Sequence, residues 1–276
     1  MGKGLFINLV VLTALLTGSC ALAAPSPGLT TILGNDEPAY PARLAAVKAL
    51  SKSLSKEEIA VLYGFLERKS GEDKSLPGEL NALKNDVVNV LKMQKVMPLD
   101  LAGHLISMYG DHSHDEVWRD YCIQHLGDIY TEISDEGDKE KAFHALWAAL
   151  DERQGSIPGT GLIALFNLCG QKGFEKDRIS TKALEMVSAS DYGEPAKITA
   201  LQICAKLGEK AVLPDARKLA ASGAVPIRMS AMACLGTLGD KSDLELLKAS
   251  GGSADVRLRT ASQAAIKKLS AKRAQE

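Results

Sequence analysis

Hydrophobic positions recur at helical spacing along nearly the whole chain, and strand-like alternation does not persist in any segment. Leu44, Val47 and Leu50 begin the pattern, and apolar residues three or four positions apart continue as far as Leu269. The pattern predicts helices beginning near 41, 214 and 243 and spanning about 56–68, 79–93, 99–109, 114–133, 139–150, 162–168, 177–189, 195–207, 226–238 and 255–269. An all-α fold is therefore expected.

The C-terminal third repeats itself at a constant interval. The positions that superpose on one another include Lys197, Arg228 and Arg259, then Ala200, Ala231 and Ser262, and finally Leu207, Leu238 and Leu269. A period of about 31 residues is typical of a solenoid, in which each unit buries its apolar face against its neighbours. We expect about six helix pairs, with the helix at 255–269 capping the stack without a partner of its own.

The segment 226–240, PIRMSAMACLGTLGD, resembles the HEAT-repeat family in the short form of phycobilisome-lyase-like units. Asp255-Val256-Arg257 is similar to the usual opening of such a unit. The resemblance implies an αα-superhelix, an armadillo-like, right-handed solenoid of HEAT-like helix pairs, and it implies a protein-binding role. We place this domain at 39–276, with the regular repeats at 195–269.

Composition and charge narrow the partner class. Hydrophobic residues make up 46% of the chain and aromatic residues only 5%, which suits close-packed helices better than a sheet. The formal net charge is −1, and no long basic stripe is present, so nucleic acid is not expected as a partner.

The N-terminus has the features of an export signal. Lys3 supplies a positive charge, Leu5 to Leu16 form an apolar run, and the small residues that follow predict a signal peptide at 1–23 and a linker at 24–38. The apolar run is too short to span a bilayer, which needs ~20 apolar residues. Cys20 lies where a bacterial lipoprotein is acylated, so the mature protein is either a soluble periplasmic or secreted protein or a lipoprotein anchored through Cys20.

Four further cysteines, Cys122, Cys169, Cys204 and Cys234, occupy apolar positions of predicted helices. A buried free cysteine behaves as a small hydrophobic residue, and this pattern favours free thiols. Cys204 and Cys234 lie in neighbouring core rows of adjacent repeats, so a disulfide between them is the alternative to be tested.

No catalytic motif or cofactor-binding motif is present, and no cofactor is expected. The candidates for metal ligands are Asp111, His112 and His114, because imidazole and carboxylate bind zinc. They form a weak set, since no second ligand pair has the required spacing. Asp111 or Ser113 is explained equally well as the N-cap of the next helix.

Lys197, Arg228 and Arg259 form a ladder of cations near helix starts, where positive charge opposes the helix dipole. The ladder is open to two interpretations. It forms either an anion-binding strip or a set of inter-repeat ion pairs with buried stems, and the compensating carboxylates are then Asp191, Glu194 and Asp255.

The sequence predicts an exported, monomeric, non-enzymatic scaffold that binds a protein or peptide in a concave groove. The residues expected to contact the partner are polar positions of the second helices: Asp215, Arg217, Lys218, Asp243, Glu245 and Lys248. Membrane attachment is expected only through a lipid anchor at Cys20. The alternative is a lyase-like or metal-dependent enzyme with a pocket near His104–His144, where all five histidines lie.

Overall fold

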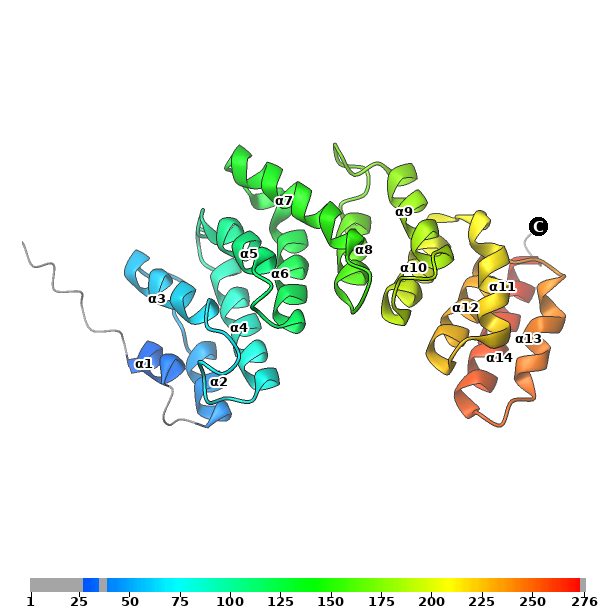
Figure 1. The fold of residues 1–276 in the computed structure, drawn as a ribbon, viewed down its shortest axis with the longest axis horizontal. Coiled ribbons are helices and arrows are strands. Elements are labelled where there is room, and N and C mark those ends of the chain that lie inside the picture. The colour runs from blue at the N-terminus through cyan, green and yellow to red at the C-terminus, as the bar shows by residue number, and fades with distance from the viewer. Residues whose placement is uncertain (1–26, 35–38, 274–276) are drawn as a thin grey trace, which may run out of the picture.

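The computed structural model describes residues 27–34 and 39–273, and within them the chain forms fourteen α-helices in a curved array (Figure 1). The odd-numbered helices are α1 (Pro27–Leu33), α3 (Lys56–Leu66), α5 (Leu101–Gly110), α7 (Glu136–Ala148), α9 (Lys176–Ser188), α11 (Leu213–Ser222) and α13 (Asp243–Gly251). The even-numbered helices are α2 (Tyr40–Lys48), α4 (Pro77–Lys92), α6 (Glu116–Ile129), α8 (Ile157–Asn167), α10 (Glu194–Leu207), α12 (Val225–Leu238) and α14 (Val256–Arg273). Single 3₁₀ turns cover Tyr130–Glu132, Ala149–Asp151 and Lys210–Val212. The described residues contain no β-strand beyond one isolated bridge, and the prediction of an all-α superhelix is confirmed.

The helices form two layers, because each odd-numbered helix packs against the even-numbered helix that follows it. The even-numbered helices also pack against one another in order, from α2 to α14. In Figure 1 the odd-numbered helices lie on the outer side of the arch and the even-numbered helices on its inner side. The described chain therefore contains seven helix pairs. The prediction of six pairs and a lone cap is wrong, because α14 packs against α13 as well as α12.

Helix α1 lies inside the segment predicted to be a linker, and it belongs to the solenoid. Leu29 and Ile32 are completely buried against the array, and α1 packs on both α2 and α3. The Pro- and Gly-containing composition of this segment concealed the two apolar residues, which are three positions apart and so lie on one helix face.

Side-chain caps begin several helices. Ser55 and Glu58 form a reciprocal capping box at the start of α3, and the Asp135 carboxylate accepts the Asp138 N–H at the start of α7. At α6 the N-cap is Asp115, whose carboxylate accepts the Trp118 N–H, and not Asp111 or Ser113 as predicted.

A recurring arginine joins the two layers. It is the fourth residue of its inner helix, and its guanidinium donates to carbonyls at or just beyond the C-terminal end of the preceding outer helix. The bonds join Arg43 to Ile32 O (2.9 Å), Arg119 to Tyr109 O (2.8 Å), Arg228 to Ala220 O (3.0 Å) and Arg259 to Ser253 O (2.7 Å) and Ala254 O (2.9 Å). The last carbonyls of a helix lack partners within it and carry the negative end of its dipole. One cation thus stabilises the end of the outer helix.

These bonds correct the interpretation of the cation ladder. Arg228 and Arg259 donate to backbone carbonyls, and Asp255 instead pairs with Arg257 at 2.7 Å. The expected conflict with the dipole of the inner helix is offset because the same charge lies at the C-terminal end of the outer helix.

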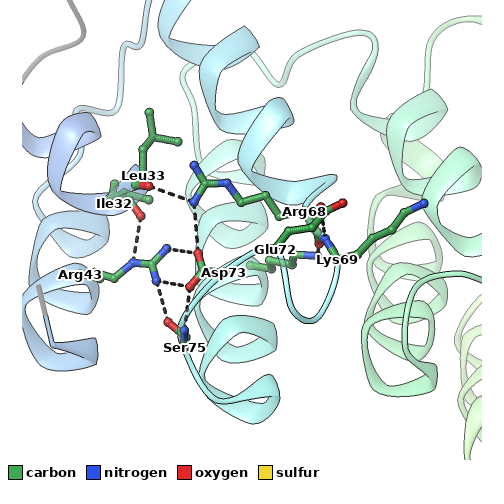
Figure 2. A network of polar contacts seen from close by, with 9 residues as sticks. Ile32, Leu33, Arg43, Arg68, Lys69, Glu72, Asp73 and Ser75 are labelled. Atoms are coloured by element: carbon green, nitrogen blue, oxygen red, sulfur yellow. Dashed lines mark hydrogen bonds and ion pairs between the residues drawn. The ribbon is translucent and has the colours of Figure 1, made fainter. Parts of the chain in front are cut away.

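In the first repeat, Arg43 also forms a deeply buried ion pair with Asp73 (Figure 2). The Asp73 carboxylate has no solvent exposure and accepts two hydrogen bonds from Arg43, both at 2.8 Å, and one from Arg68 at 3.1 Å. Burial acts to raise the pKa of Asp73, but the hydrogen bonds from Arg43 and Ser75 outweigh it and hold this pKa well below its usual range. Arg68 also donates to Leu33 O, so two arginines anchored on one aspartate hold the end of α1.

In the second repeat, the bond to the end of the outer helix comes from Lys84, which lies one turn further along its inner helix than the arginines do in theirs. Its ammonium group donates to Arg68 O beyond the end of α3 and lies 4.8 Å from the centre of the Trp118 ring. Lys84 is almost completely buried, and desolvation lowers the pKa of its ammonium group to about 8 despite the nearby Cys122, Asp115 and other acidic groups.

Candidate functional site

The inner layer carries a groove of about 320 Å³ between α6 and α8. The residues that line it are Gln124, Gly127, Asp128, Thr160, Ile163, Ala164 and Asn167. All seven residues belong to α6 or α8, two helices of the inner layer.

The groove exists because α6 and α8 approach closely at two small residues. A Cβ atom added to Gly127 would lie 2.5 Å from the Ala164 Cβ, which is far inside normal contact distance. Glycine in a helix interior costs up to ~1 kcal/mol relative to alanine, and the close approach of Ala164 accounts for a glycine at this position. The small pair leaves a hollow between the larger side chains that flank it.

The groove lining is polar but mostly uncharged. Gln124 and Asn167 present amides, Thr160 presents a hydroxyl, and each of these groups can both donate and accept a hydrogen bond. Ile163 is 45% exposed and adds an apolar surface between them. The lining can therefore form hydrogen bonds as donor and acceptor and also make apolar contacts.

A polar network around the buried His125 lies on the α6 side of the groove. Lys92 pairs with the Asp128 carboxylate at 2.7 Å, and its ammonium group lies 3.4 Å from His125 Nδ1. An ammonium group can only donate, so Nδ1 is the acceptor, and Nε2–H donates to the Asn85 side-chain oxygen at 3.0 Å. Desolvation, together with the Lys92 charge, lowers the pKa of His125 to about 4. His125 is therefore neutral at pH 7 and fixes the position of Asp128 through Lys92.

The polar residues predicted to contact a partner all lie on outer helices, α11 and α13. Several of them are used within the array: Arg217 binds the buried Asp243 at 2.6 Å and 3.1 Å, and Asp215 accepts from Ser188 at 2.7 Å. Lys218 and Glu245 remain largely exposed, and Lys248 pairs with Glu245 at 2.9 Å. Arg217 and Asp243 thus join adjacent outer helices.

The metal-ligand candidates are not gathered into one site. Asp111 pairs with Lys69 at 3.0 Å and accepts from the Ser113 N–H at 2.9 Å, which forms the turn after α5. His112 is exposed, whereas His114 is buried. Desolvation lowers the pKa of His114, and the nearby Lys84 charge lowers it further. Among the described residues no group of three or more histidine, cysteine, aspartate or glutamate side chains could hold a metal ion.

The histidines at the limits of the alternative enzyme pocket lie on different helices. His104 stacks on Tyr63 with 3.8 Å between ring centres, and its Nδ1 lies 3.2 Å from Glu67. His144 lines an open depression of about 750 Å³ beside Tyr130 and Phe143, and His104 is not among the residues that line it.

Cys122, Cys169, Cys204 and Cys234 are free thiols in the structure. Burial raises the pKa of Cys204 to about 12 and that of Cys234 to about 11. Both thiols are therefore protonated and unreactive at neutral pH.

The signal peptide predicted at 1–23 and the lipidation position Cys20 lie outside the described residues. Within the described ranges, no helix has both the length and the apolar character that crossing a bilayer requires.

Sequence comparison finds no protein family that matches the chain and no curated protein with a matching sequence. Among solved structures, the chain is similar to human deoxyhypusine hydroxylase in complex with glycerol, with 14% sequence identity and a TM-score of 0.33. The match covers 88% of this chain and 95% of that chain. A likeness of this extent assigns neither activity nor substrate to this chain, whose helical-repeat architecture is established by its own two layers of paired helices.

Sequence reasoning missed the groove, although two signals for it were present. Gly127 interrupts an otherwise regular helical pattern, and Ile163 falls outside the buried face defined by Leu162 and Leu165. Neither signal identifies the facing helix, which only the packing of α6 against α8 supplies.

Proposed function

We propose that this protein is a non-enzymatic scaffold that binds an extended segment of a partner polypeptide along its inner layer, in the groove between α6 and α8. The observation that carries the proposal is the groove lining, with amides on both helices and an exposed isoleucine between them. Asp128 adds carboxylate oxygens at the α6 side that can accept hydrogen bonds, and its charge is already paired with Lys92.

The stacked architecture supports this proposal, since consecutive repeats expose a long continuous face. The residues that support the groove are held by contacts with their neighbours. Gly127 and Ala164 fix the helix spacing, and Lys92 holds Asp128. A preorganised site binds an extended chain at lower entropic cost than a mobile one.

The proposal is tested by selecting random dodecapeptides from a display library on the purified full chain. The selected peptides are then titrated against the variants Ile163→Asp and Asn167→Ala. Both side chains line the groove, and both residues are exposed, so the fold should be retained. We expect each variant to weaken binding by about tenfold, the effect of removing one central contact.

Lys218→Ala is the matched control, because Lys218 is exposed on α11 and was among the contacts predicted from the sequence. Loss of binding in Lys218→Ala, with Ile163→Asp unaffected, would move the binding site to the outer layer. Selection of no peptide at all would count against a peptide-binding role.

We further propose that the chain is exported, from the charged and apolar pattern of residues 1–23. Mass spectrometry of the N-terminus from native cells distinguishes the two forms. A chain beginning at Ala24 indicates a soluble protein, and a lipid-modified Cys20 indicates an anchored one. An intact Met1 would contradict export.

A further inference from the structure

We propose that an apolar pocket between the α4–α5 connection and the segment after α6 binds a bulky apolar side chain from a cationic segment of another protein. The pocket has a volume of about 260 Å³ and is lined by Val96, Met97, Leu99, Ala102, Glu132, Ile133 and Ser134. None of these residues lines the groove between α6 and α8.

Apolar side chains are concentrated in this connection to an unusual degree. Met93, Val96 and Leu99 are 62%, 78% and 72% exposed, and they make up three of the seven large exposed hydrophobic residues in the described chain. Ala102 and Ile133 are buried and form the floor. Val96 and Leu99 also line the hollow, and exposed apolar side chains gathered at a hollow are typical of an interaction site.

Hydrogen bonds to the α2–α3 connection hold the α4–α5 connection in place. The Gln94 side chain accepts from the Leu54 N–H at 2.8 Å and donates to Ser51 O at 3.0 Å, which ties the α4–α5 connection to the α2–α3 connection. The Lys95 N–H adds a backbone bond to Lys52 O at 3.1 Å. The exposed apolar groups are thus presented on a fixed frame, and binding to them requires little ordering of the protein.

Charge indicates the partner. Glu132 is the one charged residue that lines the pocket within the described chain, and the exposed Asp135 and Glu136 come after Ile133 and Ser134, at the start of α7. An apolar side chain in the pocket would bring its neighbours in sequence close to these carboxylates, so lysine or arginine is favoured there. The same carboxylates oppose an anionic bilayer surface, which makes a polypeptide the better occupant.

The test uses a fluorescein-labelled peptide, Gly-Lys-Lys-Phe-Lys-Lys-Gly, titrated into the purified full chain and followed by fluorescence anisotropy. Two matched peptides replace the phenylalanine with serine or the four lysines with glutamate. We expect the phenylalanine–lysine peptide to bind at least about tenfold more tightly than either of the others.

Variants then locate the site. Leu99→Glu and Glu132→Lys are expected to weaken binding by about tenfold each. Val256→Glu and Glu245→Lys are the matched controls, since both residues are exposed on distant helices, and they should leave the dissociation constant unchanged. All four positions are exposed, and circular dichroism verifies the helical content.

Several outcomes would overturn the proposal. The serine or the glutamate peptide could bind as tightly as the phenylalanine–lysine peptide, or a control variant could lose as much affinity as Leu99→Glu. The phenylalanine–lysine peptide could also fail to bind at all. Binding to vesicles of anionic phospholipid that is lost in Leu99→Glu would identify a membrane surface instead. Concentration-dependent dimerisation lost in the same variant would identify a second copy of this chain. Ile163→Asp leaves this pocket intact, so failure here and failure of the groove proposal are distinguishable.

Discussion

His125 should make the protein sensitive to acid, because its side chain is neutral in the folded state and buried beside the Lys92 ammonium group. Its pKa falls from an ordinary value of 6.5 to about 4 on folding. Between these two values the unfolded chain binds the proton and the folded chain does not, so stability falls as pH falls. This difference between the two pKa values lowers the free energy of unfolding by about 3 kcal/mol once pH has fallen below both of them. Between pH 7 and pH 4.5 the loss is about 2.5 kcal/mol.

The assay is urea unfolding of the wild type and of His125→Gln from pH 7 to pH 4.5, followed by far-ultraviolet circular dichroism. Glutamine cannot titrate, so the difference between the two free energies of unfolding isolates the imidazole from carboxylates that titrate in both proteins. We expect that difference to change by about 2.5 kcal/mol against the wild type as pH falls. Proton NMR of the histidine ring gives a direct test, with the variant assigning the signal. A His125 pKa near 6.5, or parallel loss of stability in both proteins, would refute the reasoning.

Four further substitutions test the fold. Asp73→Asn should lower the free energy of unfolding in urea by about 3 kcal/mol, because it leaves two guanidinium groups without their buried anion, and an unchanged midpoint would contradict this. The pKa of Lys84 is about 8 in the folded state, so the free energy of unfolding of the wild type should rise by up to about 3 kcal/mol relative to that of Lys84→Met as pH rises from 8 towards 10.5. A difference between the two proteins that does not change with pH would argue that this ammonium group is solvated. Gly236→Ala should lower the thermal midpoint despite its better helix propensity, because the new Cβ would lie 2.7 Å from the Ala265 Cα, whereas the exposed Gly64→Ala should raise it.

The architecture was predictable because apolar spacing and the regular period of the C-terminal third act locally. Arg228 and Arg259 were recognised as equivalent on that basis alone. Their partners were not predictable, since a backbone carbonyl has no signature in the sequence and nearby carboxylates looked like the better candidates. Arg43 and Arg119 hold the same place in their helices, yet they escaped notice because the interval between them, which covers two helix pairs, is not a multiple of that period.

The candidate sites were predictable only in outline. Reasoning from the sequence put partner contacts on second helices of the regular repeats, and it did not foresee that two of those residues, Arg217 and Asp243, bind each other. The groove depends on which residues of α6 and α8 meet across a helix interface, and the apolar pocket depends on which loops are neighbours in space. Gln94 illustrates the second case, since its bond to the Leu54 N–H joins residues 40 positions apart.

The unequal repeat lengths explain where these surfaces lie. The intervals from Arg43 to Arg119, from Arg119 to Lys197 and from Lys197 to Arg259 each cover two helix pairs, and the last of them is clearly the shortest. The N-terminal repeats therefore carry several additional residues apiece. Because their helices are similar in length to those of the C-terminal repeats, many of the additional residues lie in the connections, such as 93–100 between α4 and α5. Connections tolerate sequence change that a packed helix face does not, because fewer buried contacts constrain them. The apolar pocket is built from one such connection, and the groove lies between helices of the same irregular half. Recognition in this protein is thus expected where the repeat departs from its shortest form, with the compact units at 195–269 acting as a rigid support.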